Sequence, residues 1–267
     1  MGSGIAQVTA TAGFRTILYD LNEGMIGNAK AKLDKDLQML ADKGRMEAGQ
    51  KADILQRIHF TSRIEDCKAD LVIEAIIEKA EAKTALFAQL AAINGPDAIF
   101  ASNTSSLSIS AIAASVPEPG RFAGLHFFNP AALMKLVEVV EGVQTAPQVT
   151  EDLAGFTRKL GKVPVVCRDS PGFIVNRVAR PYYIESLRMA EEGMDMRTID
   201  RLLEGQGFRM GPFTLMDLIG NDVNYAVSCS VYNQLGKPER LKPSPIQQDK
   251  VEKGQLGKKS GKGYYEY

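Results

Sequence analysis

The chain has 267 residues, and its 32 Lys and Arg residues balance its 32 Asp and Glu residues, so the formal net charge is zero. At about 100–200 residues per domain, this length predicts two domains. A composition of 45% hydrophobic and 24% charged residues is typical of globular proteins and excludes a largely disordered chain. The balanced charge predicts no nucleic-acid partner, because such proteins normally carry a basic surface.

The sequence also lacks the marks of secreted, membrane and zinc proteins. No apolar run reaches the ~18 residues that span a bilayer, and no signal-peptide pattern opens the chain. The three cysteines lie far apart, and there are only two histidines, which favours neither a disulfide framework nor a metal site. We therefore expect a cytoplasmic protein with no bound metal and no membrane partner.

Short apolar segments alternate with helical patterns over residues 1–168. The first elements are a small-residue helix over 4–12 and a strand over 16–19, followed by a charged helical hairpin inserted at about 23–57. The later elements are strands at 70–75, 98–101, 122–128, 136–140 and 163–166, with helices at 79–93, 109–115 and 150–160. Such alternation predicts an α/β fold, a Rossmann-type doubly wound and mostly parallel sheet.

The pattern becomes wholly helical after residue 168. Ser170 followed by Pro171 predicts a helix start, which would place Asn176 two turns into that helix. The Pro-, Gly- and Lys-rich tail from Lys237 is predicted to pack as an extended arm. The sequence thus predicts a nucleotide-binding domain over 1–168 and an all-α domain over 169–267.

The first residues resemble part of a dinucleotide fingerprint. Gly2 and Gly4 open the first helix, and Asp20 ends the next strand about 20 residues later, where a ribose hydroxyl would be bound. The strand before this helix and the leading glycines are expected to be missing, because the chain is given from Met1. A carboxylate at this position repels a 2′-phosphate, which favours NAD over NADP. That Asp20 merely ends a strand is the open alternative.

One histidine and one carboxylate stand in apolar surroundings. His126 ends an apolar strand, and the carboxyl ends of strands face the ligand crevice in open α/β sheets. Glu138 lies in the apolar run 136–140 and needs a partner if it is buried. We expect that partner to be His126, because His59 belongs to the charged hairpin. The carboxylate would orient the ring as a general base. The alternative is a structural pair, or a glutamate that points to solvent from an edge strand, and on these residues alone it is the commoner case.

Two polar segments allow two interpretations each. The hydroxyls of residues 102–106 follow a strand end, where they would donate hydrogen bonds to a substrate oxygen or cap the helix near residue 109. The amide of Asn176 would face either solvent or a cleft between the domains. Neither ambiguity is resolved by residue spacing.

Taken together, these segments closely resemble the 3-hydroxyacyl-CoA dehydrogenase family, which includes the bacterial 3-hydroxybutyryl-CoA dehydrogenases. The matching stretches follow the family's order along the whole chain: 1–7 (MGSGIAQ), 101–107 (ASNTSSL), 126–130 (HFFNP), 171–177 (PGFIVNR), 210–213 (MGPF) and 261–265 (GKGYY). The combination is far more specific than any single motif, and it reverses the balance in favour of a catalytic His–Glu pair.

The resemblance implies a reaction and a role for several residues. His126 would take the proton of the 3-hydroxyl group while a hydride leaves C3 for the nicotinamide of NAD, and Glu138 would orient the ring. Ser105 would hydrogen-bond the substrate oxygen, and Asn176 would hold the substrate from the helical domain. The implied activity is the interconversion of (S)-3-hydroxyacyl-CoA and 3-oxoacyl-CoA.

The resemblance also implies binding positions outside the catalytic pair. The implied cofactor-binding residues are Gly2, Asp20, Glu78, Lys83, Ser105, Asn129 and Lys259. Hairpin lysines such as Lys30, Lys32 and Lys43 would meet the CoA phosphates, although a solvated helix face explains them as well. The family's helical domain forms its dimer interface, which implies a homodimer.

Two other functions remain open on the sequence. A non-catalytic protein of this fold that binds NAD or CoA is supported by the missing first strand. A dehydrogenase of free β-hydroxy acids is the second alternative, but that class relies on a catalytic lysine in its helical domain, where this chain offers the His126–Glu138 pair.

Overall fold

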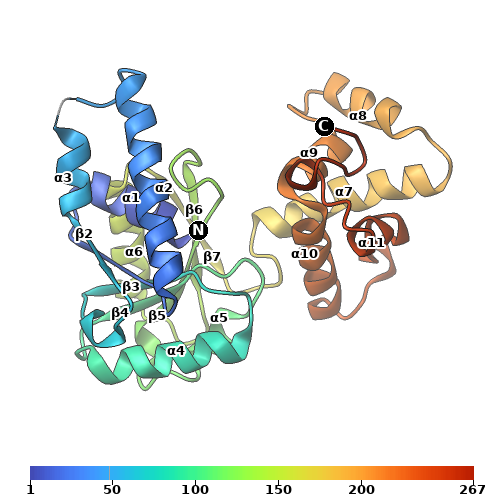
Figure 1. Cartoon of the computed structure of the whole chain (residues 1–267). Helices are drawn as coiled ribbons and strands as arrows, with labels where there is room; N and C mark the ends of the chain where they lie inside the picture. Colours follow the sequence, from blue (N-terminus) through green and yellow to red (C-terminus); the bar gives the residue numbers. More distant parts are fainter. Residues whose placement is uncertain (48) are drawn as a thin grey trace. The chain divides into compact units, whose positions relative to one another are not determined.

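The computed structural model describes residues 1–47 and 49–267. The chain divides into two compact units, Met1–Asp169 and Ser170–Tyr267, and each is described by itself (Figure 1). None of the helices in these described ranges is long and apolar enough to cross a membrane.

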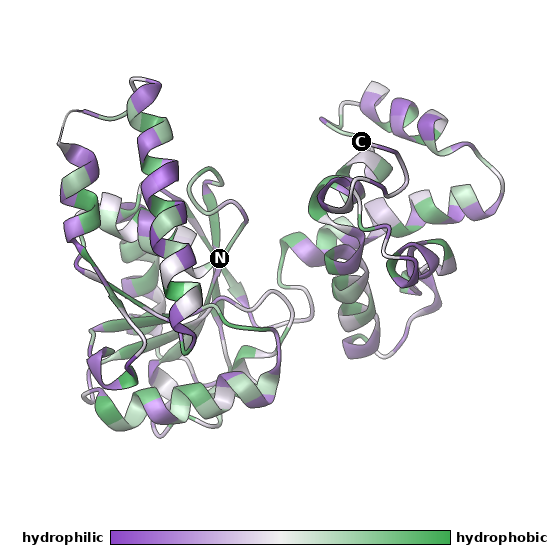
Figure 2. Ribbon diagram, in the orientation of Figure 1, coloured by the Kyte–Doolittle hydropathy of each residue, from purple (hydrophilic) through white to green (hydrophobic). Residues whose placement is uncertain are grey.

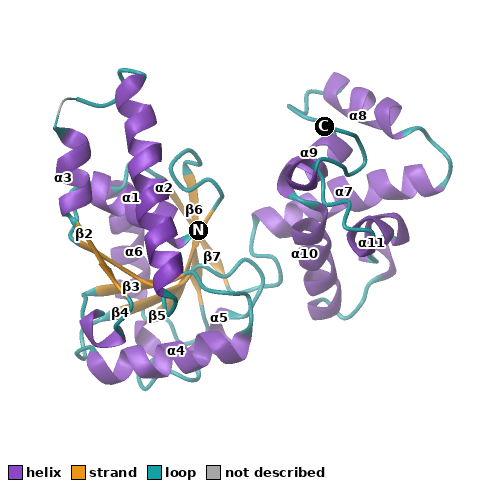
Figure 3. Cartoon of the chain, viewed as in Figure 1, coloured by secondary structure: helices purple, strands orange, loops and turns teal. Residues whose placement is uncertain are grey.

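The first unit alternates helices and strands (Figure 3). Its elements are α1 (Gly2–Thr11), β1 (Thr16–Tyr19), α2 (Glu23–Asp42), α3 (Gln50–Gln56), β2 (Ile58–Thr61), β3 (Leu71–Glu74), α4 (Ala80–Ile93), β4 (Ile99–Ser102), α5 (Ile109–Ala113), β5 (Phe122–Phe127), β6 (Leu136–Glu141), α6 (Pro147–Lys159) and β7 (Val163–Arg168). The α/β alternation is as predicted. His59, however, lies on β2 and not within the hairpin, because a four-residue strand is too short for its periodicity to separate it from a neighbouring helix.

The strands form two sheets. One contains β1 and β2, which are parallel, and the other has the order β3-β4-β5-β6-β7. All neighbours in the larger sheet are parallel except β5 and β6, which are antiparallel. A short connection joins these two strands, and such a connection suffices for an antiparallel pair, whereas parallel neighbours need a crossover. The sheet is therefore mostly parallel, as predicted.

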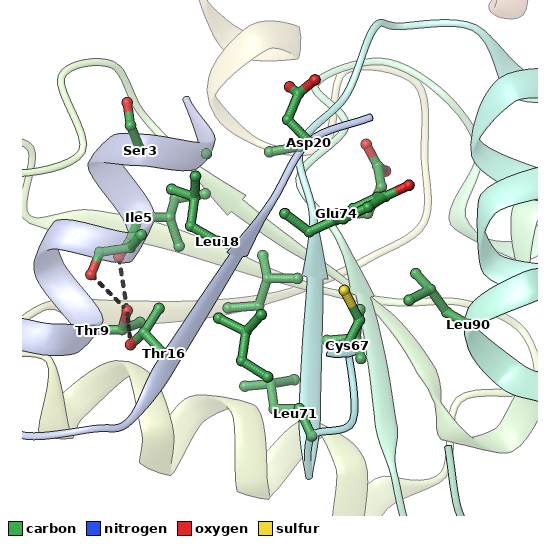
Figure 4. Close-up of a pocket in the computed structure, with 18 of the residues that line it drawn as sticks. Ser3, Ile5, Thr9, Thr16, Leu18, Asp20, Cys67, Leu71, Glu74 and Leu90 are labelled. Atoms are coloured by element: carbon green, nitrogen blue, oxygen red, sulfur yellow. Dashed lines mark hydrogen bonds between the residues drawn. The ribbon is translucent and has the colours of Figure 1, made fainter. Parts of the chain in front are cut away.

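The two sheets flank a cavity of about 1990 Å³. It is lined by β1, β3, α1, α4 and α6, and Figure 4 shows Leu18 and Leu71 among its apolar walls. Among the described residues, β1 pairs with β2 alone and β3 with β4 alone, so each strand has an unpaired edge. Both of these strands line the cavity.

The core explains why β5 reads as a continuous apolar run. All six residues of this strand are buried, and its Leu125 packs with Val139 of β6 and with Leu153 of α6. Apolar residues concentrate in these strands in Figure 2. Strands that are covered on both faces favour apolar residues throughout, so a buried polar residue on such a strand needs a specific partner.

The second unit consists of helices with short connections. They are α7 (Val175–Glu191), α8 (Met196–Gly205), α9 (Pro212–Ile219), α10 (Asn221–Gln234) and α11 (Pro245–Glu252). Its core joins α7, α8 and α9 through Leu187, Ile199 and Phe213. The all-α composition is as predicted for this part of the chain.

Two details of the second unit differ from the prediction. Helix α7 begins at Val175 and not at Ser170, because Gly172 and Phe173 adopt positive φ angles of 75° and 48° that no α-helix contains. Asn176 therefore lies in the first turn of α7. The tail is not an extended arm, since Ser244 caps α11 and Pro245 occupies its first position.

The closing motif of the chain packs on a buried carboxylate. Asp217, which is 1% exposed, accepts hydrogen bonds from the backbone N–H groups of Tyr264 and Tyr265 at 3.0 and 2.9 Å. A Cβ atom on Gly263 would lie 1.9 Å from the Asp217 Oδ1 atom. Only glycine lets the backbone approach the carboxylate this closely.

The variant Gly263→Ala is expected to lower the free energy of unfolding by about 1–3 kcal/mol, because the added methyl group forces the tail away from Asp217. Chemical denaturation measures the change. The matched control is Gly205→Ala in the same unit, where a Cβ atom meets nothing within 4 Å. If both variants unfolded with the same free energy, the close packing of the tail would not contribute to stability.

Candidate active site

A buried histidine and a buried glutamate face each other across two strands. His126 on β5 and Glu138 on β6 are directly paired in the antiparallel register, and side chains paired in this way project from the same face of the sheet. The His126 Nδ1 and Glu138 Oε2 atoms lie 2.6 Å apart. The two residues are 5% and 1% exposed. The carboxylate thus fixes the orientation of the imidazole ring in a setting of low polarity.

Neighbouring groups indicate the electrostatic character of this pair. Burial, together with the negative charge of Glu138, raises the pKa of the Cys167 thiol on β7 to about 12. The ring of Phe128 lies against that of His126, with centroids 4.5 Å apart. The pair therefore combines a carboxylate charge with an apolar flank, and both favour a strong interaction between the ring and Glu138.

The loop after β4 is held by a second carboxylate. Glu78 Oε1 accepts hydrogen bonds from the hydroxyl of Thr104 at 2.5 Å, from the backbone N–H of Ser105 at 2.9 Å and from the backbone N–H of Ser106 at 3.2 Å. Burial raises the pKa of Glu78, but the Thr104 hydrogen bond and the charge of Lys83 outweigh it, so the pKa is lowered. The ionised carboxylate fixes the backbone around Ser105.

A buried ammonium links this loop to the end of β3. The Nζ atom of Lys83 lies 2.7 Å from Glu74 Oε1 and 3.2 Å from Glu78 Oε2. The other oxygen of Glu74 accepts a hydrogen bond from the Ser102 hydroxyl at 2.7 Å. The sequence prediction missed Glu74. In the sequence, Glu74 is an acidic residue at a strand end, as Asp20 is, and nothing marks it as the one with a buried ionic partner.

An amide side chain joins the loop after β4 to strand β5. The Oδ1 atom of Asn103 accepts a hydrogen bond from the backbone N–H of Phe127 at 2.8 Å. Phe127 follows His126 directly, and β4 and β5 are neighbours in the sheet. The loop that carries Ser105 is thereby anchored at the strand end that carries His126. No sequence signal singled out Asn103 for this position.

The lowered pKa of Glu78 predicts a pH-dependent contribution to stability. A carboxylate whose pKa is lowered on folding stabilises the protein above its ordinary value of 4.5, and this contribution is lost as the pH falls through the folded-state pKa. The melting temperature of Glu78→Gln should therefore fall furthest below wild type near pH 7 and approach it near pH 3. Differential scanning calorimetry at both pH values measures this, with Glu81→Gln on the exposed side of α4 as the control. A constant difference would contradict it.

Two residues that were expected to bind the nucleotide line the cavity between the two sheets. Gly2 is the first helical residue of α1, and Asp20 follows β1 directly. Both line the cavity between the sheets, where Figure 4 shows the side chains of Ser3 and Asp20. A Cβ atom on Gly2 would meet nothing within 4 Å, so space is open beside the first turn of α1. Helix N-terminal amides suit a pyrophosphate, and a carboxylate suits ribose hydroxyls. These groups fit NAD.

The other predicted residues of the first unit lie apart from these contacts. Asn129 is exposed and precedes Pro130 through a cis peptide bond. Lys43 is exposed at the C-terminal end of α2, as is Lys30 within that helix. Lys32 forms an ion pair with Asp36. The structure thus leaves these lysines on a solvated helix.

Two predicted residues belong to the second unit. The backbone carbonyl of Asn176 accepts a hydrogen bond from Arg180 Nε at 2.9 Å. Lys259 pairs with Asp222 at 2.6 Å. Burial raises the pKa of Asp222, but its hydrogen bond from Lys259 contributes to a net lowering. Each residue is thus held by contacts within its own unit.

Comparison with known families identifies the class of protein. Residues 1–170 match the family model described as the NAD binding domain of 3-hydroxyacyl-CoA dehydrogenase. This match makes the first unit, with its α/β fold and the cavity beside α1, an NAD-binding domain of the dehydrogenase type. Residues 172–267 match the C-terminal domain model of the same enzymes. The chain belongs to the 3-hydroxyacyl-CoA dehydrogenase family, so the resemblance and the fold predicted from the sequence are confirmed.

Individual relatives are similar along the whole chain. The 3-hydroxyadipyl-CoA dehydrogenase of Escherichia coli is 48% identical, and the match covers 100% of this chain and 57% of that protein. A probable 3-hydroxybutyryl-CoA dehydrogenase of Deinococcus radiodurans is 40% identical, with 96% of it covered. The crystal structure of (S)-3-hydroxybutyryl-CoA dehydrogenase from Ralstonia eutropha matches with a TM-score of 0.95 and 35% identity, covering 100% of this chain and 95% of that one. The chain thus spans little more than half of the first relative and nearly all of the other two.

Proposed function

We propose that the protein catalyses the NAD-dependent oxidation of (S)-3-hydroxyacyl-CoA to 3-oxoacyl-CoA, and the reverse reaction. The observation that carries this proposal is the buried His126–Glu138 contact, 2.6 Å long, at a strand end beside the loop of Ser105. The names of the relatives, which are dehydrogenases of 3-hydroxyacyl-CoA thioesters, support the substrate class.

The proposed mechanism assigns the proton to His126. The imidazole accepts the proton of the substrate 3-hydroxyl group, and Glu138 stabilises the imidazolium that forms. Ser105 donates a hydrogen bond to the same substrate oxygen and holds it near the ring. NAD, when bound, accepts the hydride from C3. Asn176 holds the substrate from the second unit.

The cofactor-binding roles divide into direct and indirect ones. Gly2 opens the helix whose N-terminal amides receive the pyrophosphate, and Asp20 receives the adenine ribose. Asn129 and Lys259 are proposed to contact the cofactor directly. Glu78 contributes through the Ser105 loop, and Lys83 acts through Glu78, because the Lys83 side chain is only 1% exposed.

The test is NADH consumption by this chain with acetoacetyl-CoA as substrate. We expect turnover that requires both compounds, and a lower rate with NADPH, because Asp20 repels the 2′-phosphate. Free acetoacetate in place of the thioester should give no turnover. Activity on the free acid alone would favour a β-hydroxy acid dehydrogenase instead.

The alternative to this activity is a protein of the same fold that binds NAD or CoA without catalysis. Under this reading, NADH raises the melting temperature while acetoacetyl-CoA is not reduced. A chain extended before Met1 by an apolar strand and glycines is the control that separates the two. If only the extended chain reduced acetoacetyl-CoA, the inactivity of the shorter chain would be due to its interrupted sheet. If neither chain reduced it, the binding protein would be favoured.

Three further assignments complete the proposal. The protein forms a homodimer through its second unit, whose helices expose apolar Val178, Leu202 and Val223; sedimentation equilibrium tests this. Lys43 meets a CoA phosphate, which predicts a higher KM for the thioester in Lys43→Ala. The protein works in the cytoplasm, where its three cysteines, free in this structure, would stay reduced.

A further inference from the structure

We propose that Glu74 is a positioning residue for the reaction, and that its buried carboxylate sets the place of the loop around Ser105. Glu74 is the last residue of β3 and is 3% exposed. The inference rests on the proposed function in one respect, that Ser105 contacts the substrate.

The contacts of Glu74 reach three different elements. Its Oε1 atom accepts hydrogen bonds from the backbone N–H of Ile76 at 2.6 Å and from Lys83 Nζ of α4 at 2.7 Å. Its Oε2 atom accepts from the Ser102 hydroxyl at the end of β4, also at 2.7 Å. A single carboxylate therefore fixes the ends of two neighbouring strands relative to α4. Figure 4 shows Glu74 at the cavity between the sheets, whose lining does not include His126 or Glu138.

Two chains of contacts lead from Glu74 to the loop. In the first, Lys83 bridges Glu74 and Glu78, and Glu78 accepts hydrogen bonds from the backbone N–H groups of Ser105 and Ser106. In the second, the Ser102 hydroxyl donates a hydrogen bond to Glu74 and accepts one from the backbone N–H of Thr104 at 3.3 Å. The first chain ends at Ser105 and Ser106, and the second ends at Thr104, the residue before Ser105.

The charges around Lys83 explain why a neutral residue could not take the place of Glu74. Lys83 is 1% exposed, and a buried ammonium is stable only with ionic partners. It is paired with two carboxylates, of which the Glu74 side chain is 0% exposed and the Glu78 side chain 36%. Without the Glu74 charge, Lys83 would be drawn toward Glu78 and the solvent. Glu78 would then move, and with it the loop that it holds.

The first experiment compares Glu74→Gln with Asp169→Asn. Glutamine keeps the volume of the side chain and removes the charge. Asp169 also accepts two hydrogen bonds close to the loop, from Ser108 and from the Ser110 backbone, and the structure gives it no contact with Glu74. The readouts are hydrogen–deuterium exchange of the amides at 103–107, kcat and KM with acetoacetyl-CoA and NADH, and the melting temperature.

We expect amide exchange at 103–107 to become at least tenfold faster in Glu74→Gln and to stay at the wild-type rate in Asp169→Asn. The value of kcat should fall by about 10–100-fold, since a displacement near 1 Å of a positioned group costs about 10²-fold. The KM for NADH should change less than kcat, because Gly2 and Asp20 are untouched and only the indirect contribution of Glu78 and Lys83 is altered. A folded Glu74→Gln with wild-type exchange and wild-type kcat would overturn the proposal.

A second variant removes the risk that an unpaired Lys83 unfolds the first unit. Glu74→Gln combined with Lys83→Met leaves neither charge of that pair, and the same faster exchange is expected. Wild-type exchange in this double variant would also overturn the proposal. Faster amide exchange with an unchanged kcat would show that Glu74 holds the loop in place, but it would refute a role for Glu74 in the reaction. Turnover by the wild-type chain tests the proposed function separately, since the exchange measurement needs no activity.

Discussion

Replacing His126 with alanine is expected to lower kcat for acetoacetyl-CoA reduction by about 10²–10⁴-fold, the usual contribution of a general acid or base. In this direction the imidazolium donates the proton that it would accept during oxidation. The ring is buried, oriented by Glu138 and placed at the end of β5, so no water is held in the same position with comparable basicity. Steady-state kinetics with NADH measures the loss.

The control for this variant is His59→Ala. His59 is the other histidine of the chain and lies on the exposed side of β2, 3.8 Å from Asp66. Its replacement should leave kcat within about twofold, because its exposed side chain lies beside Asp66 and has no part in the proposed proton transfer, although it lines the cavity between the sheets. Wild-type turnover by His126→Ala, with its fold intact by circular dichroism, would refute the catalytic role of His126. NADH binding unchanged in both variants would locate the loss in the chemical step.

The variant Glu138→Gln should lower kcat by at least ~10²-fold, since removal of the orienting carboxylate of a histidine–carboxylate pair costs up to about 10⁴-fold in hydrolases. The amide keeps the shape of the side chain, but it no longer stabilises a positive imidazole ring. In the oxidation direction, which needs the neutral ring, the acidic limb of the pH profile should therefore move to lower pH. A pH series with 3-hydroxybutyryl-CoA and NAD tests both effects.

Glu141→Gln is the matched control, because Glu141 ends the same strand and is only half-buried. It should retain the wild-type profile. An unchanged profile in Glu138→Gln would make this residue a structural partner of His126 only. The readout is informative even at low activity, because the midpoint of the limb does not depend on the amplitude of the rate.

Local patterns in the sequence were enough for the class of fold and for much of the site. Apolar runs of four to six residues separated by helical periods identify a mostly parallel sheet, because strands buried on both faces tolerate few polar residues. The same rule makes a polar residue within such a run conspicuous. It singled out Glu138 and led to the pairing with His126, which the structure has at 2.6 Å. The motifs in family order identified the family.

The tertiary structure decided what depends on contacts between segments distant in sequence. The antiparallel pairing of β5 with β6, which sets His126 opposite Glu138, is a matter of register and is not encoded by the composition of either strand. Glu74 and Asn103 were missed for a similar reason. Each is an ordinary polar residue at a strand end, and its importance comes from partners 28 and 24 residues away.

The start of α7 and the fold of the tail also depend on contacts that the sequence pattern does not reveal. Pro171 favours a helix start in any sequence, but the positive φ angles at Gly172 and Phe173 delay the helix to Val175. The tail is rich in Gly and Pro, yet its Gly257 and Gly263 serve close packing on Asp217, which only the folded unit reveals. The sequence by itself determined most of the elements, the family and the catalytic candidates. The folded structure decided which side chains meet, because hydrogen bonds and charge pairs form between residues that folding brings within about 3 Å.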